Sequence, residues 1–196
     1  MATDPLEKKL TEIGYNGLFQ SGESNRAVGI WDNGRNREQL NQLIANPDAA
    51  PHAVFLAAEV LRHFQIEQNP ANYNALAKAY AYALKHSCID KAEFWGLAGN
   101  LWGFLYEEDN AGYLGKQLIK YGNAAVPYLV DLLHQKEGTI LYIGSEDATI
   151  GNGYRYRVKD FAAYYLSKIK NIPVQFHREL EERDKEIDQL EIKLKK

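Results

Sequence analysis

Five histidines and one cysteine are the side chains with which this chain of 196 residues could bind a metal ion or attack a substrate. No His-Glu-x-x-His motif occurs, and no two histidines lie four residues apart, the spacing that puts two imidazoles on one helical face. We expect His63 and His134 at the edge and the end of helices, as surface or capping residues. The sequence therefore predicts no metal site among its histidines, which are His52, His63, His86, His134 and His177.

The other candidates for chemistry also favour structural roles. Cys88 is the single cysteine, which excludes an internal disulfide, and we expect it as a small buried thiol at the end of a helix. The run Glu107-Glu108-Asp109 is typical of a solvated turn, and no Gly-x-Ser-x-Gly or phosphate-loop motif is present. Glu146 and Asp147 lack the ordered ligand series of a calcium loop. The sequence predicts no catalytic residue, no cofactor and no metal, and hence no enzyme.

Charge and hydropathy restrict the partners. The net charge of −3 gives no basic face for nucleic acid, and no apolar run approaches the roughly 20 residues that span a bilayer. The first residues show no signal peptide, so we expect a cytoplasmic protein, although a removed export signal would leave no trace. The length suggests one domain, which we place at residues 1–172, with an appended segment at 173–196.

Apolar residues recur at helical spacing along most of this domain. Glycines interrupt the pattern between residues 14 and 37, where we predict an ordered loop. A short helix is predicted at 4–13, and three antiparallel helical pairs are predicted at 38–46 with 52–66, 71–86 with 91–107, and 111–121 with 124–135.

The third pair and the helix after it resemble HEAT repeats over about residues 112–170. HEAT repeats place a valine and a proline early in their second helix, then paired leucines, and later an Arg-Val step, paired alanines, Leu and Ile. The matching residues are Val126-Pro127, Leu132-Leu133, Arg157-Val158, Ala162-Ala163, Leu166 and Ile169. An insertion near residues 136–156 departs from the family pattern. The resemblance implies an all-α fold of stacked helical hairpins, an α-solenoid array, which presents a concave surface to protein partners and carries no catalytic residues.

The insertion contains the most unusual residues of the chain. Residues 139–143 are β-prone, and aromatic and basic residues alternate from Tyr154, so we predict a β-hairpin over 139–157 with a long tip at 144–153. Inserted loops on a rigid scaffold often carry function. The alternative is that the hairpin only covers one end of the helical stack. Our predicted partner contacts are Tyr142, Tyr154, Arg155, Tyr156 and Arg157.

Residues 173–196 are predicted to form one charged helix. Its apolar residues follow a 4-3-4-3-4 spacing typical of a coiled-coil seam, with Arg183 at one position. Three arrangements stay open: self-association, packing along the chain's own body, and a protruding tail. The self-association residues would be Phe176, Leu180, Ile187, Leu190 and Leu194.

These observations favour a non-enzymatic scaffold or adaptor for protein partners. The alternative is a self-assembling structural protein that its C-terminal helix makes a homodimer, and an enzyme comes third.

Overall fold

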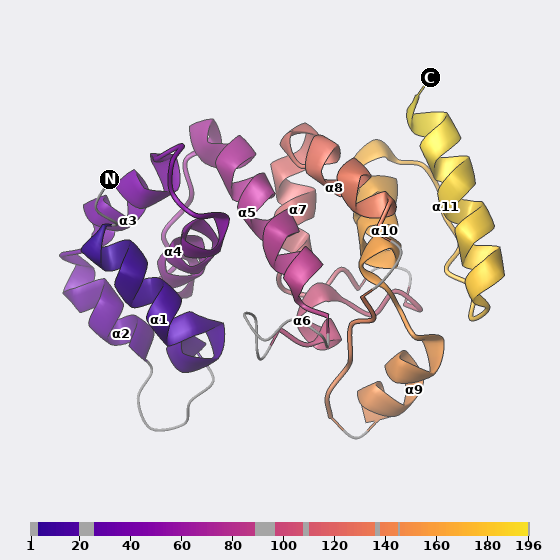
Figure 1. Ribbon diagram of the computed structural model, residues 1–196, viewed down its shortest axis with the longest axis horizontal. Helices are drawn as coiled ribbons and strands as arrows, with labels where there is room; N and C mark the ends of the chain where they lie inside the picture. Colours follow the sequence, from indigo (N-terminus) through magenta and orange to yellow (C-terminus); the bar gives the residue numbers. More distant parts are fainter. Residues whose placement is uncertain are drawn as a thin grey trace.

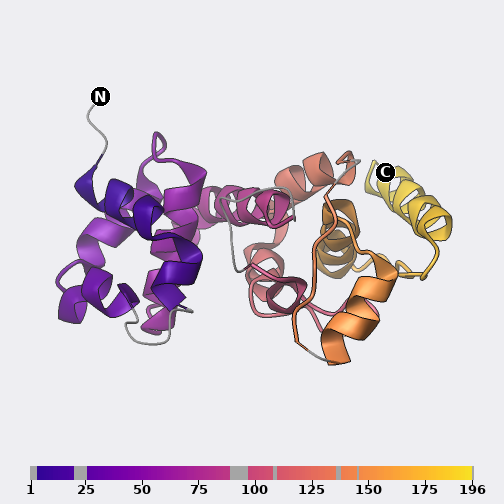
Figure 2. The same ribbon diagram turned by 60° about the horizontal axis from the view of Figure 1, so that its bottom comes forward.

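The computed structural model describes residues 4–19, 26–88, 97–107, 110–135, 138–144 and 146–195. Most of this part of the chain is helical and it contains no strand, which confirms the all-α prediction. The helices follow one another from one end of an elongated molecule to the other, so that the two termini lie at opposite ends (Figures 1 and 2).

The first group comprises α1 (Pro5–Phe19), α2 (Arg26–Trp31), the 3-10 turn η1 (Asp32–Gly34), α3 (Arg37–Ala45) and α4 (Pro51–His63). The loop predicted for 14–37 is wrong in two places. Helix α1 kinks at Gly14 (φ 66°) and then continues to Phe19, because glycine accepts a positive φ without steric cost. Helix α2 follows within the same range. Pro51 lies in the first turn of α4, where its missing N–H costs little.

The turn η2 (Pro70–Asn72) leads into α5 (Tyr73–His86), which packs extensively on α4. Both helices bury alanines, among them Ala57 and Ala58 of α4 and Ala77 and Ala81 of α5. Such small side chains allow a close approach of the two axes. The pairing of α3 with α4 and the helix at 71–86 are as predicted.

The helix predicted at 91–107 is wrong over its described part. Only α6 (Gly99–Trp102) forms, and the chain turns at Gly103, whose φ is 122°. A Cβ on Gly103 would lie 2.4 Å from the Asn110 oxygen, and one on Gly112 would lie 2.3 Å from the Gly103 nitrogen, so the two backbones touch here. Residues 91–96 of this prediction lie outside the described ranges.

The next pair is α7 (Gly115–Tyr121) and α8 (Val126–Leu133), joined by η4 (Gly122–Ala124). Gly122 ends α7 with φ 57° and Pro127 lies in the first turn of α8, as the sequence predicts.

The segment predicted as a β-hairpin has a different structure. Thr139 and Arg157 form one isolated antiparallel bridge, the described residues contain no strand, and α9 (Glu146–Tyr154) occupies the place of the predicted tip. Beyond this bridge, the side chains of two asparagines bind the backbone groups that a partner strand would have bound. Asn152 accepts from the Tyr142 N–H (2.8 Å) and donates to its carbonyl (3.1 Å), and Asn100 does the same to Ile143 (2.8 and 3.0 Å).

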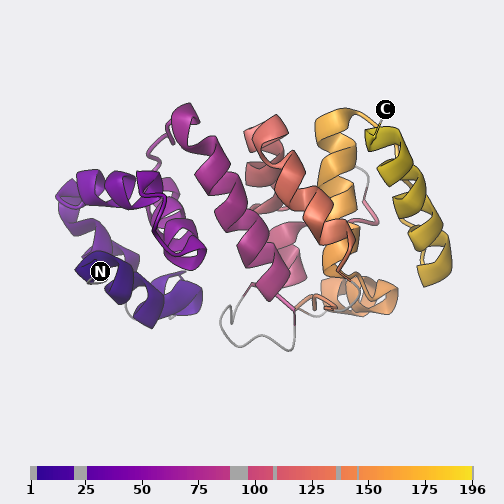
Figure 3. The ribbon, with the colours of Figure 1, turned by 45° about the horizontal axis from the view of Figure 1, so that its top comes forward.

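The chain ends with α10 (Val158–Lys170), a connector at 171–179, and α11 (Leu180–Leu194). The helix predicted for 173–196 therefore begins later than expected. Helix α11 packs beside α10, as Figure 3 shows, and buries Arg183, Ile187 and Leu190. Of the three arrangements considered for this segment, the structure shows packing along the chain's own body.

Candidate functional site

Two of the five predicted contact residues lie in the core. Tyr142 is 2% exposed and donates from its hydroxyl to the Gly103 carbonyl at 2.7 Å, and Tyr156 is fully buried. The Tyr142 ring is packed between Gly99 and Gly151, whose added Cβ atoms would lie 3.0 and 2.4 Å from it. Neither ring is available to a partner in this structure.

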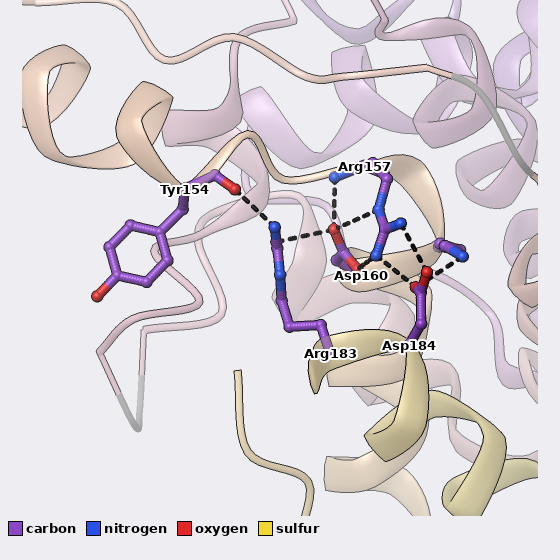
Figure 4. A network of polar contacts seen from close by, with 6 residues as sticks. Tyr154, Arg157, Asp160, Arg183 and Asp184 are labelled. Carbon is purple, nitrogen blue, oxygen red and sulfur yellow. Dashed lines mark hydrogen bonds and ion pairs between the residues drawn. The ribbon is translucent and has the colours of Figure 1, made fainter. Parts of the chain in front are cut away.

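Arg157, the third predicted contact, belongs to an internal network of charges (Figure 4). Its guanidinium donates to the Asp160 carboxylate at 2.9 and 3.1 Å, and to the Asp184 carboxylate at 2.7 and 3.2 Å. Lys159 also contacts Asp184, at 2.8 Å. Asp160 is completely buried and accepts in addition from the Arg157 backbone N–H at 2.8 Å, which stabilises the start of α10.

Arg183 completes this network from α11. Although its side chain is only 1% exposed, it donates to Asp160 at 2.9 Å and to the Tyr154 carbonyl at 2.6 Å. We call these five residues, Arg157, Lys159, Asp160, Arg183 and Asp184, the charged latch, because they join α10 to α11.

The contacts of the charged latch shift the pKa values of Arg157, Arg183 and Asp184. Burial of the Arg183 guanidinium, helped by the neighbouring Arg157, lowers its pKa although Asp160 opposes that effect. For Arg157, burial lowers the pKa, but the hydrogen bonds that it donates to Asp160 and Asp184 outweigh burial and the pKa is raised. Burial raises the pKa of Asp184, yet its bonds to Arg157 and Lys159 outweigh that and lower it.

A groove of about 990 Å³ lies beside the latch. Its walls come from four parts of the chain: residues 105–106, Tyr154 at the end of α9, the last turns of α10, and residues 171–176 of the connector, with Glu186 of α11 at its edge. We call it the tyrosine groove, after Tyr106, Tyr154 and Tyr164.

Aromatic contacts hold these walls in place. Tyr154 stacks on buried Tyr156 with ring centroids 5.1 Å apart, and Tyr106 stacks on Tyr154 at 5.6 Å. Across the groove floor, Tyr164 meets Phe176 edge to face at 5.6 Å. Because each ring rests on another ring, the apolar lining is pre-formed rather than assembled by a ligand.

Charged side chains of both signs lie along the groove. Lys168, on α10, has its ammonium 5.4 Å from the centroid of the Tyr164 ring. Glu186, on α11, accepts from the Gln175 backbone N–H at 3.4 Å and lies 3.9 Å from the His177 ring. The groove thus combines an aromatic lining with a cation and an anion in different places.

A second buried charge lies far from this groove. Glu59 of α4 is 1% exposed and accepts hydrogen bonds from Arg62 and from the Tyr80 hydroxyl of α5. The Arg62 guanidinium also covers the Tyr113 ring, 3.4 Å from its centroid. The hydrogen bond between Glu59 and Tyr80 therefore joins α4 to α5.

The remaining sequence candidates agree with structural roles. Cys88 is a buried free thiol, as predicted, and His63 and His134 are exposed at or next to helix ends. Within the described ranges, no three His, Cys, Asp or Glu residues are grouped as a metal site would require. Over the same residues, no helix combines the length and the apolar character needed to cross a membrane.

Comparison with protein-family models, with curated proteins and with solved structures found no match to this chain. The candidate site therefore depends on the geometry alone.

Tyr154 and Arg155 are the predicted contacts that remain accessible, and Tyr154 lies in the groove. Sequence reasoning missed Tyr106, Lys168 and the connector residues. The one available signal was Pro173 after Ile172, which ends a helix and starts an extended segment.

Proposed function

We propose that this protein is a non-enzymatic scaffold that binds a segment of another protein in the tyrosine groove. The observation that carries the proposal is the groove itself, with its pre-formed lining of Tyr106, Tyr154 and Phe176, the last of which rests on buried Tyr164.

The residue types of the groove support a protein ligand. Tyrosine is enriched at protein interfaces and provides large contact areas with few rotatable bonds. The volume is in the range of ligand-binding clefts, and charged groups at its edge would fix the orientation of a bound segment.

We further propose that the helices form a HEAT-like array of stacked hairpins. Support comes from the order of packing, in which α4 contacts α5, α5 contacts α7 and α8, and these contact α10. The Val-Pro and Arg-Val positions of the resemblance begin α8 and α10.

A homodimer built on α11 receives less support. Ile187 and Leu190, two of its five proposed contacts, are buried against the chain's own body, and Phe176 and Leu194 are partly buried against the core. Dimerisation through them would require α11 to leave α10 and break the charged latch.

Photo-crosslinking tests the proposal. A benzoylphenylalanine at position 106, in the groove, is compared with one at position 113, where Tyr113 is 44% exposed on another part of the surface. In lysate of the source cells, we expect one crosslinked protein with the probe at 106 and none with the probe at 113.

The crosslink should disappear when Lys168→Glu is added, because Lys168 lies in the groove. It should persist with Lys78→Glu, a charge reversal at an exposed site on α5. Equal crosslinking from both probe positions would contradict a binding site in the groove.

A further inference from the structure

The connector beside the tyrosine groove has the pattern of an edge strand. From residue 171 to residue 176 exposed and half-buried side chains alternate, with Ile172, Val174 and Phe176 toward the protein and Pro173 and Gln175 toward solvent. A period of two residues is the signature of an extended chain.

Few backbone groups of this connector have a hydrogen-bond partner among the residues that the structure describes. The Ile172 N–H donates to the Ser167 carbonyl at 3.0 Å, and the Gln175 N–H donates to the Glu186 carboxylate at 3.4 Å. Within the described part of the chain, neither the N–H nor the C=O of Val174 and Phe176 makes a hydrogen bond.

The direction of these groups follows from the geometry of an extended chain. The N–H and C=O of one residue point to the same side, and those of the next residue point to the opposite side. Since the Gln175 N–H points to Glu186 of α11, the groups of Val174 and Phe176 point away from that carboxylate. Both residues also line the groove.

Unpaired groups on an extended segment are a template for an added strand. We propose that the tyrosine groove binds its protein ligand as an extended peptide that pairs with the backbone of Val174 and Phe176. This inference rests on the proposed function and specifies the mode of binding. A helical ligand fits less well, because a helix satisfies its own backbone and would leave the Val174 and Phe176 groups unpaired.

The charges along the groove define the peptide further. Lys168 is in the last turn of α10, just before the connector, and Glu186 contacts the connector at Gln175. Because the unpaired groups of Val174 and Phe176 face away from Glu186, the charge that the ligand meets is that of Lys168. The ligand is therefore an extended segment with an acidic residue near Lys168 and an apolar residue on the same face, against the aromatic lining.

Selection from a random nonapeptide phage library on the full-length chain tests this mode. We expect the enriched peptides to carry an acidic residue and, on the same face of an extended chain, an apolar residue. Synthetic copies are then N-methylated one residue at a time. Methylation at alternate residues should weaken binding by about tenfold each, since one hydrogen bond is lost, and methylation between them should have little effect.

A matched pair of protein variants tests the connector. Val174→Pro removes the N–H but keeps three side-chain carbons, whereas Val174→Ala keeps the N–H and removes two methyl groups. We expect about a tenfold loss of peptide affinity for Val174→Pro and less than about threefold for Val174→Ala, with unchanged circular dichroism for both.

Three results would overturn the inference: no enriched peptide, enriched peptides with a helical pattern, or binding indifferent to N-methylation and to Val174→Pro. A dimer of the chain that Val174→Pro dissociates would also overturn it, because the occupant would then be a second copy. If the crosslink from position 106 persists in any of these cases, the scaffold function stands and only the strand mode is wrong.

Discussion

Replacement of Asp160 by asparagine should destabilise the protein more than any other single change in the charged latch. The amide oxygen can still accept the Arg157 backbone N–H, so the start of α10 keeps its cap. The negative charge disappears, however, and Arg183, which is 1% exposed, loses the carboxylate that compensates its buried guanidinium. Removal of one partner from a buried ion pair costs about 3–5 kcal/mol.

Arg183→Met should cost less stability than Asp160→Asn. It removes the bonds to Asp160 and to the Tyr154 carbonyl, but it also removes a guanidinium that is costly to bury, and Asp160 keeps Arg157 as a partner. We expect a cost of about 1–3 kcal/mol. In the Asp160→Asn background the same change should be stabilising, because the uncompensated charge is then gone.

Urea unfolding followed by far-UV circular dichroism measures all four members of this cycle. For a chain of this size, 3–5 kcal/mol corresponds to a fall in Tm of about 6–20 °C. If Arg183→Met costs the same free energy with and without Asp160→Asn, the two residues are not coupled and the reasoning is refuted. A loss below about 1 kcal/mol for Asp160→Asn would refute it equally.

Three other outcomes are expected. Gly151→Ala should cost about 1–3 kcal/mol, because its Cβ would lie 2.4 Å from the Tyr142 ring. Gly153→Ala, whose Cβ would lie 3.6 Å from the Arg178 guanidinium, should be neutral in the same urea assay, and equal effects would contradict the packing of α9. Burial raises the pKa of six tyrosines, which are Tyr15, Tyr80, Tyr121, Tyr142, Tyr156 and Tyr165. Because the unfolded chain ionises tyrosines near pH 10, the stability of the fold should decrease above that pH. The absorbance of these phenolates at 295 nm should appear only on unfolding. The pKa of Asp184 is lowered in the fold, so its contribution to the free energy of unfolding is complete above about pH 4 and is lost as the pH falls. The loss should be below about 1 kcal/mol, and amide exchange in α11 should accelerate accordingly. Asp184→Asn should abolish this pH dependence.

Local patterns predicted the helices where packing agrees with propensity. Val54 to Leu61 and Leu76 to Leu84 contain clear helical repeats, and α4 and α5 form where these occur. The helix predicted through Gly103 is wrong because that residue meets Gly112 across a turn, a contact that periodicity does not contain. The hairpin prediction recognised the pairing of Thr139 with Arg157 but could not identify the partners of Tyr142 and Ile143, which are the side chains of Asn152 and Asn100.

The candidate site was less accessible to sequence reasoning. Its walls come from segments near residues 106, 154, 164 and 174, and no single pattern relates them. The neighbouring charged latch, by contrast, left a usable signal in Arg183. An arginine in an otherwise apolar seam indicates a buried carboxylate, and Arg183 finds Asp160 on α10, 23 positions earlier in the chain.

Three hydrogen bonds converge on the short stretch around α6, and they have a consequence for biosynthesis. The Gly99 N–H donates to the Leu141 carbonyl, and the Trp102 and Gly103 carbonyls accept from the hydroxyls of Tyr165 and Tyr142 respectively. Tyr165 lies 63 positions after Trp102 in the chain. A helix of four residues is not stable alone, because nucleation costs more than so few bonds return. During translation, residues 97–103 therefore gain these hydrogen-bond partners only after α10 has been made. A nascent chain stalled before Tyr165 would present them as an unpaired apolar stretch in need of a chaperone.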